Sequence, residues 1–437
     1  MHSLPSILSL LACAAAAQVP WTQAQLQADL REIAAVLKTD WAYYQDRTRH
    51  AGLDLDALLA EAEAALPAVR SIDEFARVLR RFTAGLQDGH AWSHVPGESA
   101  APGRWLPFQV AGCAEGLVVT AVATGVQGPS RGDLLLRIDG TAVADLLRTG
   151  EAMLAGSTPG MRRRKAIQEL QRHAGQTVRC AFATPAGAEH ELTLATVAPD
   201  QVPPPPLQEL PNWTLQWPRT DVALLRIASF AVPRWQEWLQ AKPEAREPFL
   251  QEGRGRIDAI VAELCAKDAR VLLLDLRGNG GGTDLLGIHL AERLLENPFE
   301  YFRLSARHDG RWAPPGALTY GKGKHPRFLG AVVALVDERC FSTTDNFLRC
   351  LDDLHPEFTV VGRPSGGGTG APRQLVVATH SKAVLGACTQ RVYGPRGRLI
   401  EGRGTEPDLR VAWTRADWTL GRDPDLAAAL ALSERGK

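Results

Sequence analysis

The chain of 437 residues has little lysine, no net charge and no long apolar run after about residue 20. Eight of its 49 basic residues are lysine, so arginine supplies most of the positive charge. The basic residues balance 49 acidic ones, and a formal charge of +0 provides no overall field to attract nucleic acid or an anionic lipid surface. We therefore expect neither of these as a partner.

A membrane-spanning helix needs about 18 or more consecutive apolar residues, and no such stretch follows residue 20. The N-terminus is apolar over residues 4–17 and ends in three alanines, which is typical of a secretory signal peptide, predicted at residues 1–17. The run from Leu10 to Cys13 also resembles a bacterial lipoprotein box, so lipid attachment at Cys13 is the alternative. Both interpretations place the protein in the periplasm or outside the cell.

Cysteine is infrequent, with seven residues, of which six remain after removal of a signal peptide. An oxidising compartment would permit disulfides, but the sequence does not give their pairing, and burial as small core residues is an equal alternative. No CxxC occurs and no His/Cys cluster has zinc spacing, so we expect no metal and no cofactor.

A helical domain is predicted over residues 18–100. Apolar residues recur at steps of three and four between residues 21 and 86, which favours three amphipathic helices. The third helix is predicted to begin at Ser71, whose hydroxyl would cap it, with Glu74 three residues later.

A β-rich module is predicted over residues 101–202. An apolar strand at residues 117–122 is followed by a second strand and a return strand, with Asp139-Gly140 as the turn between those two. This pattern resembles the central hairpin of PDZ domains, which bind extended peptide ends, although an ordinary β-hairpin would read the same. A stiff linker at Pro203–Pro206 closes the module.

The last predicted domain, residues 203–437, alternates strands with helices, which is typical of a buried sheet in an α/β domain. The strands are expected at 222–227, 271–276 and 329–336, and the helices at 257–265 and 285–295.

Two junctions in this domain carry candidate chemistry. The strand at 271–276 enters a loop with four glycines at residues 278–282, whose open N–H groups could bind an anion; the GxxxxGK[ST] sequence of a phosphate loop is absent. Ser342 follows another strand and opens a helix, where its hydroxyl could serve as a nucleophile or simply cap the helix.

These segments together resemble the tail-specific or C-terminal processing serine proteases, in particular their tricorn-like and interphotoreceptor-retinoid-binding-protein-like branch. The resemblance covers most of the mature chain and implies a multi-domain α/β protein with a protease core of the ClpP/crotonase-like type. It is carried by these segments in order: Leu86–His90, the PDZ-like hairpin, Leu225–Phe230, Asp275–Gly281, Ser342, Gly362–Gly366 and Glu401–Asp408.

The resemblance implies that Ser342 attacks a peptide carbonyl and that the backbone N–H groups of Thr343 and Gly281 hold the oxyanion. The tricorn-like branch implies His90 as the general base, oriented through Glu401. Residues 343–381 contain no lysine, which disfavours a Ser-Lys dyad, and leaves Lys382 as a lesser candidate. Gly89 stands where the tricorn pattern has a serine.

We therefore expect an exported serine peptidase that acts on peptide or protein substrates. The alternatives are a protease-like protein with weakened or lost turnover that binds peptides or apolar ligands, and an esterase that uses the same hydroxyl. The sequence leaves the oligomeric state open.

Overall fold

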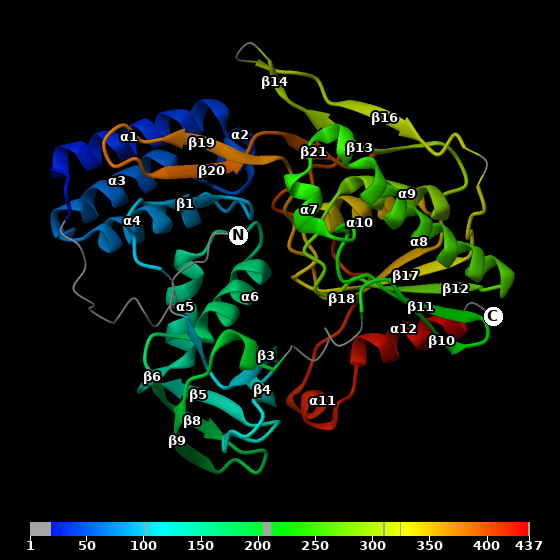
Figure 1. Cartoon of the computed structure of the whole chain (residues 1–437), viewed down its shortest axis with the longest axis horizontal. Helices are drawn as coiled ribbons and strands as arrows, with labels where there is room; N and C mark the ends of the chain where they lie inside the picture. The colour runs from blue at the N-terminus through cyan, green and yellow to red at the C-terminus, as the bar shows by residue number, and fades with distance from the viewer. Residues whose placement is uncertain (1–18, 101–102, 204–210, 309–310, 324, 436–437) are drawn as a thin grey trace. The chain divides into compact units, whose positions relative to one another are not determined.

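A computed structural model describes residues 19–100, 103–203, 211–308, 311–323 and 325–435. The predicted signal peptide, Cys13 and most of the proline run lie outside the described residues. Two compact units emerge, coloured along the chain in Figure 1. The first unit draws on Met1–Glu209, Pro372–Thr389 and Ala412–Asp423, and the second on Leu210–Ala371, Gln390–Val411 and Pro424–Lys437.

The first unit begins with helices, as predicted. They are α1 (Gln23–Asp40), α2 (Tyr44–His50), α3 (Leu55–Ala65) and α4 (Ile72–Gly85), with a short 3-10 turn at Leu66–Ala68. Ser71 and Glu74 form the expected capping box at the start of α4, where the Ser71 hydroxyl accepts from the Glu74 N–H. Helix α2 was not predicted, because seven residues are too few to show a helical period.

Part of the predicted last domain belongs instead to the first unit. Strand β1 (Trp92–His94) pairs antiparallel with β20 (Val384–Cys388), which pairs antiparallel with β19 (Pro372–Val377). The β19–β20 turn is tied to α1, because the buried Asp29 carboxylate accepts the His380 and Ser381 N–H groups at 2.9 and 2.7 Å. The predicted boundary missed this return because strand pairing of distant segments leaves no local signal.

The β-rich module forms a sheet in the order β3-β4-β5-β8-β9, with β6 beside β5. Its strands are β3 (Phe108–Cys113), β4 (Gly116–Val122), β5 (Leu134–Ile138), β6 (Thr141–Ala142), β8 (Thr177–Ala183) and β9 (Glu189–Ala195), with β2 (Arg104–Trp105) pairing β7 (Arg172–His173) and a 3-10 turn at Pro199–Gln201. Asp139 and Gly140 both have positive φ, as the predicted hairpin turn requires. The return strand has only two residues because apolar side chains then recur at helical spacing, and the chain continues into α5 (Val143–Met153) and α6 (Pro159–Leu170).

The segment 412–423 also belongs to the first unit. It carries α11 (Arg415–Leu420), and Trp413 and Trp418 pack with Val118 of β4 in one buried cluster. The predicted domain 203–437 therefore differs from the observed second unit at two insertions.

The second unit is built on a six-stranded sheet in the order β10-β11-β12-β17-β18-β22. The strands are β10 (Thr214–Arg219), β11 (Val222–Arg226), β12 (Val271–Asp275), β17 (Ala331–Val336), β18 (Phe358–Gly362) and β22 (Leu409–Arg410). All neighbours pair in parallel except β10 with β11. This confirms the α/β architecture that the apolar strand runs predicted.

Both faces of this sheet are covered, as Figure 1 shows. Alternate strand residues such as Leu272 and Leu274 pack in the cluster that includes α8 (Glu247–Ala266), α9 (Asp284–Leu294) and α10 (Thr343–Leu354). The intervening residues, such as Leu273, pack in the cluster that includes α12 (Pro424–Arg435). Burial on both sides explains why the strands are continuously apolar.

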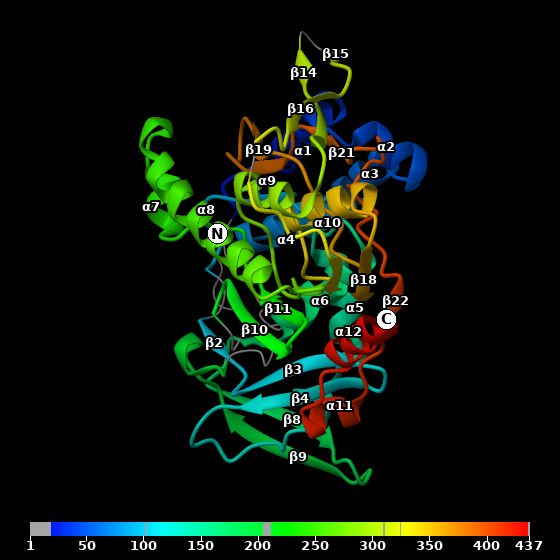
Figure 2. The same ribbon diagram turned by 90° about the vertical axis from the view of Figure 1, so that its right-hand side faces the viewer.

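The remaining elements of the second unit are α7 (Trp235–Gln240), a 3-10 turn at Pro243–Ala245, β13 (Phe299–Ser305), β14 (Arg307–His308), β15 (Arg311–Trp312), β16 (Gly316–Tyr320) and β21 (Arg391–Tyr393). Strand β13 lies between β16 and β21. Figure 2 shows β14 and β15 at the tip of an extension beyond α9 and α10.

The cysteines of the described residues are joined by no disulfide, and four of them, Cys180, Cys340, Cys350 and Cys388, are buried. They therefore serve as small core residues in this structure. Within the same described part of the chain, none of the helices combines the length and the apolarity that crossing a membrane would take.

Buried charges connect the sheet to the glycine loop. Arg277 forms a two-point pair with Asp275, at 2.9 Å from Nε and from Nη2, and reaches Asp425 of α12 at 3.1 Å. Arg226 donates to the carbonyls of Asp275 and Arg277. The guanidinium groups thus satisfy carbonyls and carboxylates that the parallel strands leave at their carboxyl ends.

We predict that Arg277→Ala lowers the free energy of unfolding by about 3–5 kcal/mol, because it leaves buried carboxylates without their cation. Urea unfolding followed by circular dichroism measures this. The matched control is Arg303→Ala, which removes an exposed pair with Glu300 and should cost at most about 1 kcal/mol. Equal losses in the two variants would contradict the structural role of Arg277.

Candidate active site

Ser342 lies between β17 and α10 in a strained backbone conformation. Its φ is 63° and its ψ is −122°, a region that residues other than glycine seldom occupy and that costs on the order of 1–3 kcal/mol. The Ser342 N–H donates to the Gly368 carbonyl at 2.8 Å, and the Ser342 carbonyl accepts the Asn346 N–H at 3.1 Å. The side chain makes no capping hydrogen bond, so the helix-cap alternative from the sequence is wrong.

The glycine loop lies directly against Ser342. Gly281 has a φ of +101°, and a Cβ placed on it would lie 2.9 Å from the Ser342 Cβ and 3.0 Å from the Thr343 nitrogen. Gly282 has a φ of +152°, and its Cβ would lie 2.2 Å from the Phe230 carbonyl carbon. Both positions therefore require glycine, and the loop contacts the serine through backbone alone.

Asn279 fixes the shape of the glycine loop. Its Nδ2 donates to the Ile227 carbonyl at 3.0 Å, and its Oδ1 accepts the Gly281 N–H at 2.9 Å. The Asn279 carbonyl accepts the Phe341 N–H at 3.0 Å, which joins the loop to the segment before Ser342. The Gly281 N–H, predicted as an oxyanion donor, thus has an acceptor in this structure. Asn279 is a residue whose role the sequence did not reveal.

Thr343 is the first residue of α10, so its N–H lies at the positive end of the helix dipole and has no acceptor within the helix. Its hydroxyl donates to the Gly282 carbonyl at 3.3 Å, which holds the helix start against the glycine loop. A negative oxygen formed beside Ser342 would meet this N–H and the helix dipole.

Glu401 is a buried carboxylate of the same unit, with 1% of its surface exposed. It is therefore not a solvent-exposed carboxylate on a surface turn. One carboxylate oxygen accepts the Thr369 N–H at 2.9 Å, and the Thr369 hydroxyl donates to the Asn346 Oδ1 at 2.6 Å. Because Asn346 is on the first turn of α10, this chain of contacts connects Glu401 to the helix that Ser342 begins.

Residues 365–369 lie between these two side chains. Gly368 holds the Ser342 N–H, Thr369 holds Glu401, and the Gly367 carbonyl accepts the Gly402 N–H at 2.7 Å. The buried Asp345 carboxylate accepts from the Ser365 hydroxyl and from the Gly368 N–H. Burial raises the pKa of Asp345 to about 7, although these donors and Arg349 oppose the rise.

His90 belongs to the first unit, in the turn that follows α4. Asp88 fixes this turn: one carboxylate oxygen accepts the His90 N–H at 2.8 Å, and the other accepts from the Trp41 ring at 2.8 Å and the Cys388 N–H at 3.2 Å. Lys165 donates to the Gly89 carbonyl at 3.2 Å. These contacts orient the backbone on either side of the imidazole.

The imidazole of His90 is neutral at pH 7. The pKa of His90 is lowered to about 4, mainly by burial; the charge of Asp88 opposes this shift and that of Lys165 adds to it. A neutral imidazole can accept a proton, as a general base must.

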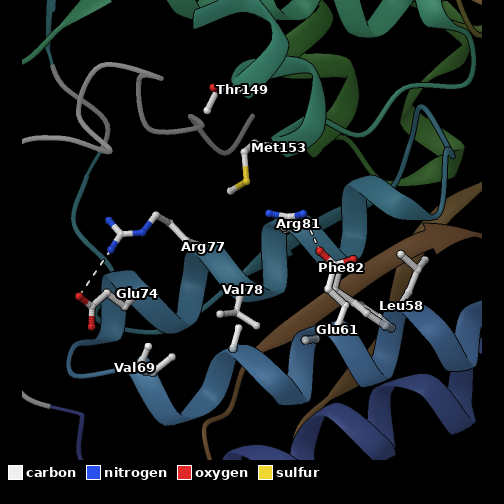
Figure 3. A pocket seen from close by; sticks show the side chains of 13 residues that line it. Leu58, Glu61, Val69, Glu74, Arg77, Val78, Arg81, Phe82, Thr149 and Met153 are labelled. Atoms are coloured by element: carbon white, nitrogen blue, oxygen red, sulfur yellow. Dashed lines mark ion pairs between the residues drawn. The ribbon is translucent and has the colours of Figure 1, made fainter. Parts of the chain in front are cut away.

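Two cavities lie within the first unit. One, of about 480 Å³, is lined by His90 together with Trp92, Met153 and Lys165 among others. The other, of about 400 Å³, lies between α3 and α4, with Thr149 and Met153 of α5 across its mouth (Figure 3). The second cavity has mainly apolar walls and contains none of the predicted site residues.

The structure brings Ser342, Thr343, Gly281 and Glu401 together in the second unit, while the first unit carries His90. Lys382, the other candidate base, is exposed on the first unit, and its ammonium donates to the Thr379 carbonyl at 2.8 Å.

Known proteins are similar to this chain in sequence or in fold. The family model described as peptidase family S41 matches residues 221–411. A putative tricorn protease homolog 2 of Streptomyces coelicolor is 25% identical in an alignment 416 residues long, which covers 87% of this chain. This chain spans about 30% of the length of that relative.

Among solved structures, mature CPAF complexed with lactacystin superposes with a TM-score of 0.73 at 17% identity, over 91% of this chain and 95% of that chain. A putative peptidase from Parabacteroides merdae superposes with a TM-score of 0.53 at 15% identity, over 93% and 96% of the two chains. These likenesses confirm the predicted fold. The chain is therefore a multi-domain α/β protein, and its residues 221–411 are similar to peptidase family S41.

Proposed function

We propose that this protein hydrolyses peptide bonds through an acyl-enzyme formed on Ser342. The observation that carries the proposal is the strained Ser342 at the start of α10, with its hydroxyl unused in capping and the glycine loop against it. Strained serines between a strand and a helix present their oxygen to a substrate while the helix dipole favours negative charge. Residues in such conformations persist only where the surrounding structure holds them.

His90 is the general base of the proposed reaction. A serine hydroxyl is a weak nucleophile until a base accepts its proton, and His90 is neutral at the pH of the reaction. The lysine-free stretch at 343–381 supports a histidine base over a lysine base. We assign Glu401 the role of orienting the imidazole, because it is a buried carboxylate joined through Thr369 to α10.

The oxyanion of the tetrahedral intermediate is assigned to the N–H groups of Thr343 and Gly281. The Thr343 N–H is available at the start of the helix. The Gly281 N–H contributes if it is shared between the oxyanion and the Asn279 Oδ1 that now accepts it. The proton taken by His90 then passes to the leaving amine, and water hydrolyses the acyl-enzyme by the same steps in reverse.

We place the enzyme in the periplasm or outside the cell, on the strength of the apolar run and the three alanines that end at residue 17. Intact mass of the protein purified from its native host tests this assignment. Cleavage after Ala17 supports export, a diacylglyceryl mass on Cys13 supports the lipoprotein alternative, and an uncleaved chain in the cytoplasm contradicts both.

We predict that a fluorophosphonate adds one adduct to the wild-type protein and none to Ser342→Ala, because only an activated serine reacts. His90→Ala should slow labelling by about 10²–10⁴-fold, the range that a general base contributes. Intact-mass spectrometry follows the adduct, and circular dichroism shows that each variant is folded. Turnover of a peptide by Ser342→Ala at the wild-type rate would overturn the mechanism.

We predict that Gly281→Ala slows labelling by about 10²-fold, because its Cβ would displace Ser342 and Thr343 by tenths of an ångström. The matched control is Gly280→Ala, whose Cβ would meet nothing within 4 Å. The ratio of the two labelling rates removes the general effect of added bulk in the loop. Equal rates would show that close approach of Gly281 is unimportant.

The cavity of Figure 3 favours a second candidate function, the binding of a small apolar molecule. Leu58, Val69, Val78 and Phe82 provide its walls, and charged side chains at its edge include Arg81, paired with Glu61. A fluorescent naphthalene probe titrated into the wild type and Ala65→Trp tests it. Saturable binding that the tryptophan abolishes, without fluorophosphonate labelling of Ser342, would favour this function over hydrolysis.

A further inference from the structure

We propose that Asp345 is a positioning residue, whose carboxylate holds residues 365–368 in the shape that fixes Ser342 on one side and Glu401 on the other. The inference rests on the proposed function, because it concerns how the nucleophile Ser342 is connected to the buried carboxylate of Glu401. Asp345 lies on the first turn of α10, three residues after Ser342, and is fully buried.

The hydrogen bonds around Asp345 require the ionised form. The Ser365 Oγ accepts the Thr405 N–H at 2.7 Å, so the Ser365 hydroxyl directs its proton to Asp345 Oδ1. Asp345 Oδ2 accepts the Gly368 N–H at 3.0 Å, and the Gly367 N–H adds to these donors. Both carboxylate oxygens therefore act as acceptors, and a proton on either one would displace a donor.

The same loop carries the contact to each proposed catalytic side chain. The Gly368 residue that donates to Asp345 also accepts the Ser342 N–H at 2.8 Å through its carbonyl. The next residue, Thr369, donates its N–H to Glu401. Loss of the Gly368 contact would free the segment that holds Ser342 in its strained conformation.

The ionised form of Asp345 does not stabilise the fold. Its pKa in the folded protein is about 7, above the ordinary value, because burial outweighs the hydrogen bonds. The stabilisation that this group contributes is fully present below its unfolded pKa and is lost as the pH rises through about 7. The ionised carboxylate therefore lowers the stability of the folded protein, and we attribute its presence to its role in ordering residues 365–368.

A pH dependence follows from this arrangement. The charged and titratable groups that face Asp345 are Arg349, one turn further along α10, and the Cys340 thiol before it; the loop donors are neutral, and Glu401 lies beyond Thr369. Only the ionised carboxylate of Asp345 holds the loop in place, so activity is lost as the pH falls through about 7. A profile limited by His90 would instead fall near pH 4.

The experiment measures the second-order rate of fluorophosphonate labelling from pH 4.5 to 9 for the wild type, Asp345→Asn and Ser365→Ala. We expect the wild-type rate to fall about tenfold per pH unit below pH 7. Asp345→Asn should label about 10²-fold more slowly at pH 8 and lose the fall near pH 7, because an amide cannot accept at both atoms or titrate.

Ser365→Ala tests the assignment in the opposite direction. It removes a donor that favours the ionised carboxylate, so the pKa of Asp345 should rise. The fall in labelling rate at low pH should then begin at a higher pH. The matched control is Asp29→Asn, which changes another buried carboxylate, in α1 of the first unit, bonded to the His380 and Ser381 N–H groups. It should leave the fall in rate near pH 7 in place.

If the labelling rate of both Asp345→Asn and Ser365→Ala falls near pH 7 as in a normally labelled wild type, the role of Asp345 is overturned and the proposed function stands. An equal shift of the pH profile in Asp29→Asn would also overturn it. No labelling of the folded wild type at any pH would overturn the proposed function and this inference together.

Discussion

The hydrogen bond from the Ser342 N–H to the Gly368 carbonyl, together with the positive φ of Ser342, is the constraint on which the rest of the site depends. A serine held in this region would relax if the loop at 365–369 moved. The loop is held in turn by Asp345 and by the 401–405 segment. Backbone contacts, more than side-chain packing, therefore shape the site.

Buried ion pairs support the site at the ends of the strands. The pairs of Arg277 with Asp275 and Asp425 lie at the carboxyl ends of the parallel strands, where the glycine loop begins. Parallel α/β sheets place their ligand sites at this edge because loops from several strands converge there. The buried ion pairs satisfy the strand ends, and the loop that follows approaches Ser342 closely because Gly281 has no side chain.

Local pattern predicted much of the fold. The capping box at Ser71, the turn at Asp139-Gly140 and the continuously apolar strand at 271–275 each follow from rules that act over a few residues. The sequence did not predict that segments 372–389 and 412–423 pack into the first unit, because contacts between distant segments depend on the whole chain. The same holds for Asn279 and Ser365, whose partners lie elsewhere in the sequence.

The sequence by itself determined which side chains could do the chemistry: a serine at a strand-to-helix junction, four glycines after a buried strand, and no lysine where a lysine base would be expected. The tertiary structure alone decided that Ser342 is strained and does not cap its helix, that Glu401 is buried, and that Asp345 faces three donors. Strain, burial and pKa are properties of an environment, and that environment is assembled from segments that only folding brings together.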